Sequence, residues 1–445
     1  MKLIAASLLA ASVLGTTTVI AGADRVGDFV NPYLKKKQIP GCALLVRHNR
    51  KVVLATGYGI ANLEHGVPVK SQTVFQSGSI NKQFTAMAVM VLVQERKLAL
   101  DDPISKYLAV PASWSGITVR HLLTHTSGLG DYPENFSLQR DYTEDELLKM
   151  VATQPLGFAP GEKWRYSNLG YVTLGILIGK ASSEFWGDFL RKRVFDQLDM
   201  KHARVISEAD VIPNRAAGYV LNDHVLKNQK WVSPSVNATA DGSLYFTIED
   251  LAKWDEALEA QKLLSRANYE QMWTPVRLND GTTAPYGFGW RIAKADSGHR
   301  MIEHGGNWQG FASYIVRYPD DRLTVAALCN RSGASAGYIA KRIAGFYVPA
   351  LAQRLHTAVK LDPATLSSCA GDYRLEDRFT IKVSVADSRL ETTWLGEKTV
   401  LIPESETVFF EEDSDRTFRF VKDGKGKVTS LVVSVPEELT LHKLP

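Results

Sequence analysis

Residues 79–93 read SINKQFTAMAVMVLV, in which the chain's only Ser-x-x-Lys tetrapeptide is followed at once by an almost wholly apolar run. A run that is apolar on nearly every side predicts a central, buried helix. Because residues three apart lie on the same face of a helix, we expect the Ser79 hydroxyl and the Lys82 amine to meet. A nucleophile with a base within reach is the minimum equipment for covalent catalysis.

Two further motifs, each found once in the chain, contain residue types that suit the same chemistry. They are Tyr166-Ser167-Asn168 and His304-Gly305-Gly306. A tyrosine hydroxyl can relay or abstract a proton when nearby cations depress its pKa, and the two glycines allow a backbone to come close to a ligand. Taken alone, Ser79 also suits a helix N-cap, Tyr166 a core tyrosine and His304 a structural histidine. Only the three motifs together point to a site.

The order of these motifs resembles that in the serine β-lactamase and penicillin-binding protein superfamily, in its class C-related branch. That branch also contains D-aminopeptidases, D-Ala-D-Ala carboxypeptidases and carboxylesterases. Supporting segments lie at 117–129 (ITVRHLLTHTSGL), 286–290 (YGFGW) and 305–311, and the resemblance covers about residues 27–355. It implies an α+β fold, with an antiparallel sheet, packed helices and a helical subdomain. His125, in the first of these segments, is expected to shape a loop near the site.

The resemblance implies that three residues carry out bond formation and proton transfer. Ser79 would be the acylated nucleophile, and Lys82 the base that helps to remove its proton. Tyr166 would act with Lys82 as general base and then donate a proton to the leaving group. No residue is identified as a dedicated deacylating glutamate, so deacylation is assigned to Tyr166 and Lys82 as well.

Four further residues are implied to bind the substrate: Asn168, His304, Gly306 and Asn307. Asn168 would hydrogen-bond both Lys82 and the substrate amide. The backbone N–H groups of Ser79 and Asn307 would form an oxyanion hole, in which one donor is worth about 3–4 kcal/mol of the barrier.

The third motif departs from the pattern of the penicillin-directed members, which usually carry Lys-Thr-Gly or Lys-Ser-Gly there. A lysine is a permanent cation that grips the carboxylate of a β-lactam or of a peptide C-terminus. His304 stands at that position here, and an ordinary histidine titrates near about pH 6.5, so it is mostly neutral at neutral pH. The histidine form resembles the aminopeptidase, amidase and esterase members, and we expect weaker recognition of carboxylates.

Short strands fill the C-terminal part of the sequence and predict a separate all-β domain. Turn residues, such as those at 423–426, separate short apolar runs within 362–445. We expect a small barrel or sandwich, similar to the lipocalin-like C-terminal domains of some superfamily members, that either caps the cleft or mediates dimers. In the preceding domain, strands are predicted that complete one antiparallel sheet, at 42–47, 51–55, 313–318 and 323–328.

The N-terminus has the pattern of a secretory signal peptide over residues 1–23. Lys2 supplies the positive start, residues 3–14 the apolar middle, and Ala21-Gly22-Ala23 a small-residue cleavage site. The alternative is an N-terminal anchor that stays uncut. No later stretch reaches the roughly 18 apolar residues of a membrane span. We therefore predict a secreted or periplasmic protein with a signal peptide over 1–23, a catalytic domain over 24–358 and the β domain over 362–445.

The composition is that of an ordinary globular protein. The 445 residues are 45% hydrophobic and 22% charged, and the net charge of +4 is too mild to suggest nucleic acid as a partner. Cys42, Cys329 and Cys369 have no metal-like spacing. We expect them to be buried as small hydrophobic side chains, although one disulfide stays open and the sequence does not choose its pair. No cofactor or metal is predicted, and the oligomeric state is left open.

These observations lead to the hypothesis of a secreted serine hydrolase that acts through an acyl-enzyme on small amides, short peptides or esters. The closest alternative is a β-lactamase or a D-Ala-D-Ala carboxypeptidase, which the histidine at position 304 disfavours. An alternative of another class is a non-catalytic protein that binds cell-wall fragments, and the intact Ser79, Lys82 and Tyr166 disfavour it.

Overall fold

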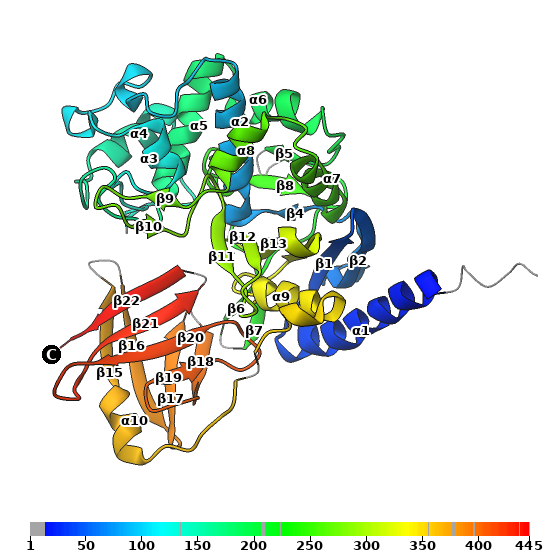
Figure 1. The fold of residues 1–445 in the computed structure, drawn as a ribbon, viewed down its shortest axis with the longest axis vertical. Helices are drawn as coiled ribbons and strands as arrows, with labels where there is room; N and C mark the ends of the chain where they lie inside the picture. Colours follow the sequence, from blue (N-terminus) through cyan, green and yellow to red (C-terminus); the bar gives the residue numbers. More distant parts are fainter. Residues whose placement is uncertain are drawn as a thin grey trace, which may run out of the picture.

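The computed structural model describes residues 14–133, 135–205, 210–222, 224–354, 356–375, 379–394, 397–435 and 437–444. A domain of helices and sheets comes first, and a closed β-barrel follows it (Figure 1). The predicted α+β class, with an antiparallel sheet, packed helices and a barrel-like C-terminal part, is confirmed.

A seven-stranded antiparallel sheet forms the centre of the first domain, and both ends of that domain contribute to it. Its strands, in spatial order, are β11 (Arg291–Lys294), β12 (Arg300–Trp308), β13 (Phe311–Tyr318), β14 (Leu323–Cys329), β1 (Gly41–His48), β2 (Lys51–Asn62) and β3 (Val67–Pro68). Side chains alternate between the faces of a strand, and on β1 they enter two different cores. Leu44 and Val46 pack with α1 (Leu14–Lys36) and α9 (Ala336–Tyr347), whereas Leu45 faces the larger core around α2.

The larger core holds the helical subdomain, whose centre is α2 (Lys82–Gln94). Every residue from Lys82 to Leu92 is buried, as the apolar run predicted. The other helices around this core are α3 (Val119–Leu123), α4 (Glu144–Ala152), α5 (Asn168–Ser182), α6 (Trp186–Leu190), α7 (Ile248–Glu259) and α8 (Arg266–Met272). Most begin at a Ser or Thr whose side chain accepts a backbone N–H, as Thr247 does for α7.

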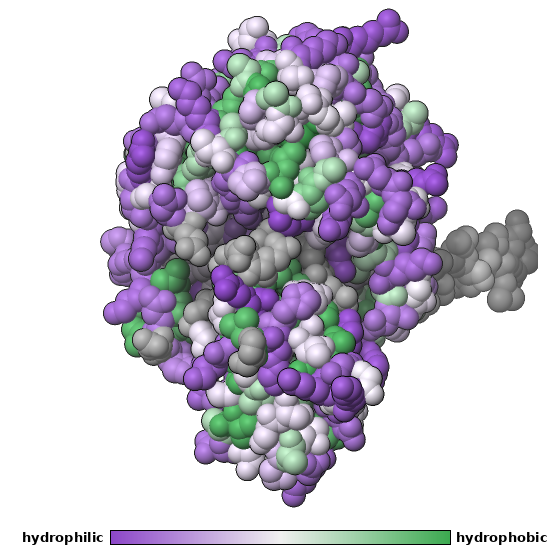
Figure 2. Space-filling model, turned by 90° about the vertical axis from the view of Figure 1, so that its left-hand side faces the viewer, coloured by the Kyte–Doolittle hydropathy of each residue, from purple (hydrophilic) through white to green (hydrophobic). Residues whose placement is uncertain are grey.

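One three-stranded sheet, with β8 (Leu244–Phe246) in the middle, and two strand pairs complete the first domain. They are β4 (Phe75–Gln76) with β8 and β5 (Arg204–Val205), β6 (Tyr219–Asn222) with β7 (Val225–Asn228), and β9 (Val276–Arg277) with β10 (Thr283–Ala284). Figure 2 shows hydrophobic side chains gathered in a strip over the upper part of the molecule, which holds the helices, with hydrophilic side chains around the edges.

The C-terminal part is a helix, α10 (Pro363–Cys369), followed by an eight-stranded closed barrel. Each strand pairs with the next in antiparallel fashion, and β15 pairs with β22 to close the barrel. Its strands are β15 (Gly371–Leu375), β16 (Phe379–Ala386), β17 (Arg389–Trp394), β18 (Glu397–Pro403), β19 (Val408–Phe410), β20 (Thr417–Lys422), β21 (Val428–Val435) and β22 (Glu437–Lys443). Inward-facing side chains such as Phe409, Phe418 and Leu441 fill one apolar core. The predicted domain boundaries themselves stay a prediction.

The loop between β19 and β20 fastens the barrel to helix α1. Lys36 Nζ lies 2.6 Å from a carboxylate oxygen of Asp413, and Lys37 Nζ donates to the carbonyl of Glu412 at 2.7 Å. The Tyr33 hydroxyl donates to the carbonyl of Asp413 at 3.0 Å. These contacts place the barrel against the face of the sheet that α1 and α9 cover.

A second contact joins the barrel to α9 and to β12. Lys341 Nζ on α9 lies 3.2 Å from Asp415 of the barrel loop and 3.4 Å from Glu303 on β12. Burial alone would lower the pKa of Lys341, but Glu303 and Asp415 raise it. Glu303 is buried, and an unpaired buried charge is costly. Lys341 pairs with both carboxylates and so ties the barrel to the strand that carries His304. The expected roles of the barrel as a cap or a dimer contact stay predictions.

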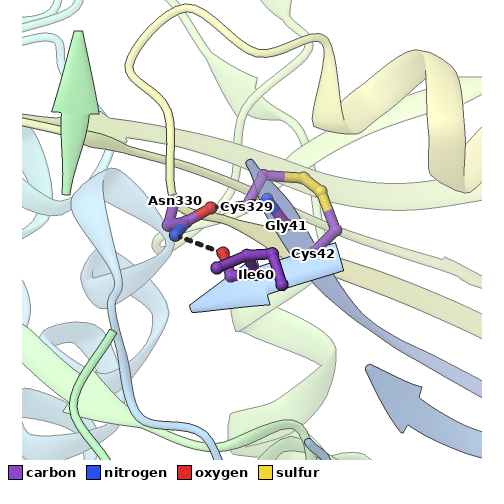
Figure 3. Close-up of a disulfide and its surroundings, with 5 residues drawn as sticks. All are labelled: Gly41, Cys42, Ile60, Cys329 and Asn330. Atoms are coloured by element: carbon purple, nitrogen blue, oxygen red, sulfur yellow. Dashed lines mark hydrogen bonds between the residues drawn. A yellow bond between two sulfur atoms is a disulfide. The ribbon is translucent and has the colours of Figure 1, made fainter. Parts of the chain in front are cut away.

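Two of the three cysteines form a disulfide in the centre of the sheet. Cys42 and Cys329 lie directly opposite each other on β1 and β14, and their sulfurs are bonded (Figure 3). Beside the disulfide, the Asn330 side chain donates to the carbonyl of Ile60 at 3.0 Å and accepts from the Gly41 N–H at 2.8 Å. Cys369 is buried as a free thiol. All three cysteines are buried, as expected, and the disulfide that the sequence left open joins Cys42 to Cys329.

Most of the predicted signal peptide lies outside the described residues, which begin at Leu14 within α1. Among the described residues, no helix combines the length and the apolar character that a membrane span requires. The cleavage site after Ala23 stays a prediction.

We expect the double variant Cys42→Ala/Cys329→Ala to be less stable than the wild type by about 2–5 kcal/mol, because the disulfide restricts the unfolded chain. Thermal unfolding by circular dichroism checks this. Dithiothreitol should lower the melting temperature of the wild type and leave that of the double variant unchanged. Equal melting temperatures for the wild type and the double variant in the absence of dithiothreitol would contradict the expectation.

Candidate active site

Ser79 lies in a 3-10 turn (Gly78–Asn81) directly before α2. The sequence placed Ser79 at the start of the helix itself, but the α-helix begins at Lys82. The N-cap residues of the turn and of α2 are Ser77 and Asn81. Ser79 therefore does not act as a helix cap, and its side chain is partly exposed at the end of a buried helix.

The amine of Lys82 connects three separate segments of the chain. Nζ lies 3.1 Å from Ser79 Oγ, 2.8 Å from Asn168 Oδ1 and 2.8 Å from the carbonyl oxygen of Asp241. Lys82 itself is fully buried. A buried amine requires partners of this kind, because leaving water without them is costly. The expected meeting of Ser79, Lys82 and Asn168 is therefore present.

Strand β12 lies so close to the Ser79 turn that only glycine fits at two positions. A Cβ on Gly306 would come within 2.7 Å of the Ser79 nitrogen, and a Cβ on Gly78 within 2.6 Å of the Asn307 nitrogen. Gly78 also has a positive φ of 53°, which favours glycine. The backbone nitrogens of Ser79 and Asn307 thus lie on facing segments, as an oxyanion hole requires. The sequence predicted that the glycines after His304 allow a close approach of the backbone. In the structure, the backbone that Gly306 approaches is that of the Ser79 turn.

His304 is buried and carries no positive charge. Burial, with a smaller effect of nearby Lys82, lowers its pKa to about 3. Its Nδ1 lies 2.6 Å from the carbonyl of Gly305, which can only accept, so Nδ1 carries the proton. Nε2 lies 2.8 Å from the Tyr286 hydroxyl and must accept from it. This position therefore offers no cation to a substrate carboxylate.

Tyr166 and His125 lie side by side next to Lys82. The Tyr166 ring centre lies 4.9 Å from Lys82 Nζ and 4.3 Å from the His125 ring centre. His125 is buried, and its Nδ1 accepts the backbone N–H of Ser167 at 3.2 Å. Burial, together with Lys82 and His304, holds the pKa of His125 well below its ordinary value. His125 thus fixes the segment that presents Tyr166, in line with the expected loop-shaping role.

Three residues of the site were missed by the sequence analysis. The carbonyl of Asp241 accepts from Lys82, and its buried carboxylate accepts from the Tyr132 hydroxyl at 3.2 Å. Burial raises the pKa of Asp241, although Lys82 opposes this. Asp131 accepts from Asn168 Nδ2 at 3.1 Å, and Tyr286 pairs with His304. Asp131 and Asp241 belong to no short motif, so no local pattern pointed to them. Tyr286 begins the 286–290 segment, but the sequence analysis assigned it no role.

A pocket of about 230 Å³ opens beside Asn307. Leu138, Trp308, Gln309 and Ser332 line the rest of it. The indole nitrogen of Trp308 is buried and has no hydrogen-bond partner among the described residues. A ligand held at Asn307 would therefore meet a mainly uncharged surface. Within the described part of the chain, no group of three or more potential metal ligands is present.

Comparisons with known proteins identify the family. A family model described as "Beta-lactamase" matches residues 26–347, which is well over half of the chain, and the chain belongs to this family. It is 29% identical over 429 residues to "Penicillin-binding protein 4*" of Bacillus subtilis (strain 168), covering 88% of this chain and 94% of that one. It is 25% identical over 305 residues to a "D-aminopeptidase" of Gluconobacter oxydans (strain 621H), covering 66% and 57% respectively.

Solved structures show the same fold. An octameric penicillin-binding protein homologue from Pyrococcus abyssi superposes with a TM-score of 0.68 at 24% identity, covering 94% of this chain and 99% of that one. A D-amino acid amidase from Ochrobactrum anthropi SV3 superposes with a TM-score of 0.64 at 22% identity, covering 74% and 97%.

The lowered pKa of His304 predicts a specific loss of stability in acid. Between about pH 3 and 6.5 the unfolded chain binds a proton at this residue and the folded protein does not, so stability falls as pH falls through that window. We expect the wild type to lose up to about 1.4 kcal/mol more per pH unit than His304→Gln. Urea unfolding at several pH values checks this, with exposed His65→Gln as the control. Parallel curves for the wild type and His304→Gln would contradict it.

Proposed function

We propose that the protein is a secreted serine hydrolase that forms an acyl-enzyme on Ser79 from small amides, short peptides or esters and then releases the acyl group to water. The observation that carries the proposal is the 3.1 Å separation between Ser79 Oγ and the buried Nζ of Lys82, which Asn168 and Asp241 also hold. A nucleophile and a base in direct contact, with the base oriented by further groups, is the arrangement that covalent catalysis uses.

In the proposed first step, neutral Lys82 takes the proton of Ser79 as its oxygen attacks the substrate carbonyl. The negative charge that develops on the carbonyl oxygen is stabilised by the N–H groups of Ser79 and Asn307. Tyr166, next to Lys82, passes a proton to the leaving group. The same pair then activates water for deacylation.

The preferred substrates are proposed to lack a carboxylate at the position that faces the third motif. Support comes from His304, which is neutral and already committed to Tyr286 and Gly305. Amides of amino acids, including D-amino acids, fit this requirement, and relatives named D-aminopeptidase and D-amino acid amidase point in the same direction. The relative named penicillin-binding protein favours the alternative of a β-lactamase or D-Ala-D-Ala carboxypeptidase.

A secreted or periplasmic location is part of the proposal. The N-terminal sequence supports it through its positive start, apolar middle and small-residue cleavage site. The Cys42–Cys329 disulfide supports it independently, because disulfides persist in oxidising compartments.

We expect Ser79→Ala to lose at least about 10³-fold in kcat on any substrate of the wild type, because the nucleophile is absent. Hydrolysis of p-nitrophenyl acetate and of D-amino acid p-nitroanilides measures this, and mass spectrometry with a fluorophosphonate probe should find the adduct on the peptide that contains Ser79. The exposed Ser115→Ala variant is the control. Hydrolysis by Ser79→Ala at the wild-type rate would refute the enzyme assignment. A wild type that neither hydrolyses nor reacts would favour the binding protein.

Two peptides that differ only at the C-terminus test the substrate class. We expect a D-Ala-D-Ala peptide with a C-terminal carboxamide to have a kcat/KM equal to or above that of the free acid, because His304 offers no charge to the carboxylate. A preference of tenfold or more for the acid, about 1.4 kcal/mol, or rapid labelling by a fluorescent penicillin, would favour the carboxypeptidase or β-lactamase alternative.

A further inference from the structure

We propose that Asp131 is a positioning residue, which holds the Asn168 amide in the one orientation that leaves the lone pair of Lys82 on the Ser79 hydroxyl. This inference rests on the proposed function, because it concerns the step in which Lys82 deprotonates Ser79. Asp131 belongs to none of the three sequence motifs, and it acts through Asn168 without touching the reacting atoms.

The first step of the argument is the amide of Asn168, which has a donor end and an acceptor end. Its Nδ2 donates to Oδ2 of Asp131 at 3.1 Å, and its Oδ1 accepts from Lys82 at 2.8 Å. An ionised carboxylate only accepts hydrogen bonds. Asp131 therefore selects the nitrogen end of the amide, and the oxygen end is left for Lys82.

The backbone around Asn168 does not make this selection by itself. Asn168 is the first residue of α5, and its position is fixed because the N-cap Ser167 accepts from Gly170 and donates to Gly130. The terminal torsion of an asparagine has broad, roughly two-fold preferences, so the two amide orientations are close in intrinsic energy. The choice between them has to come from a neighbour, and Asp131 directly follows the anchored Gly130.

The second step is the geometry of the Lys82 amine. Three oxygens lie within hydrogen-bond distance of Nζ: Ser79 Oγ, Asn168 Oδ1 and the carbonyl oxygen of Asp241. The last two atoms can only accept. A neutral amine has two hydrogens, which go to these two acceptors. The lone pair is then available to the Ser79 hydroxyl, 3.1 Å away.

A flipped Asn168 amide would remove this arrangement. Its NH₂ group would face Lys82, and the lone pair of the amine would accept from Asn168. One amine hydrogen would then point at Ser79 Oγ, so that Lys82 would donate to the nucleophile that it has to deprotonate. Asp131 therefore controls the direction of proton transfer through one hydrogen bond.

Single substitutions at Asp131 separate this role from that of its charge. Asp131→Ala removes the acceptor. Asp131→Asn removes the charge but keeps a carbonyl oxygen that can accept from Asn168. Asp131→Val, which also lacks an acceptor, replaces the alanine variant if that variant does not fold. Asp145→Ala removes an exposed carboxylate at the start of α4 and serves as the control.

The measurement is the rate constant for labelling of Ser79 by a fluorophosphonate probe across pH, which needs no knowledge of the natural substrate. We expect the high-pH plateau of Asp131→Ala to fall by about 10–100-fold, which is at most the lower end of what a positioned general base contributes. Asp131→Asn should stay within about threefold of the wild type, and Asp145→Ala should match it. Thermal unfolding of each variant identifies any loss of folded protein.

Equal plateaus for Asp131→Ala and the wild type would overturn the inference, and so would an equal loss in Asp131→Ala and Asp131→Asn, since charge alone would then explain the effect. These outcomes differ from a failure of the proposed function, in which the wild type itself would not be labelled on Ser79.

Discussion

The site depends on the burial of one amine. Lys82 is fully enclosed, and a buried amine without partners would be strongly destabilising. Its partners come from the turn before α2, from the first residue of α5 and from the segment before β8. The requirement to satisfy one nitrogen therefore fixes the relative positions of three segments that are far apart in the sequence. Strand β12 completes the site by direct backbone packing, which the glycines at 78 and 306 permit. Burial of Lys82 and the tight approach of β12 together leave little freedom in the position of Ser79.

Local patterns were sufficient to predict the parts of the fold that local forces determine. The apolar run after Lys82 predicted a helix buried on all sides, and α2 is that helix. The early and late strand pairs of the first domain were predicted to share a sheet, and β1 pairs with β14. The Ser79–Lys82 contact followed from helical spacing, even though the turn that carries Ser79 is a 3-10 turn.

The remaining features depend on tertiary arrangement. Asp131, Asp241 and Tyr286 take part in the site through side-chain or carbonyl contacts across 37, 159 and 18 residues. No short motif marks Asp131 or Asp241, and the 286–290 segment alone gave Tyr286 no role. The pairing of Cys42 with Cys329 requires the register of β1 against β14, which the sequence does not state. The attachment of the barrel through its 411–415 loop could not be predicted from the sequence either. Lys36, which pairs with this loop, looks in the sequence like any exposed lysine. In each case, the residue type indicated which interactions the side chain can make, but only the fold identifies the residue with which it makes them.

The position of β1 in the sheet has a consequence for how the chain assembles. β1 lies between β2, its neighbour in sequence, and β14, which is joined to it by a disulfide across 287 residues. During synthesis, the edge of β1 that later pairs with β14 stays unpaired until nearly the whole first domain has been made. Pairing between strands so far apart in the sequence is slow. The barrel is the opposite case, since each strand meets the next as soon as it is made. For a chain secreted as proposed, the sheet closes, and the cysteines meet, only after most of the polypeptide has crossed the membrane.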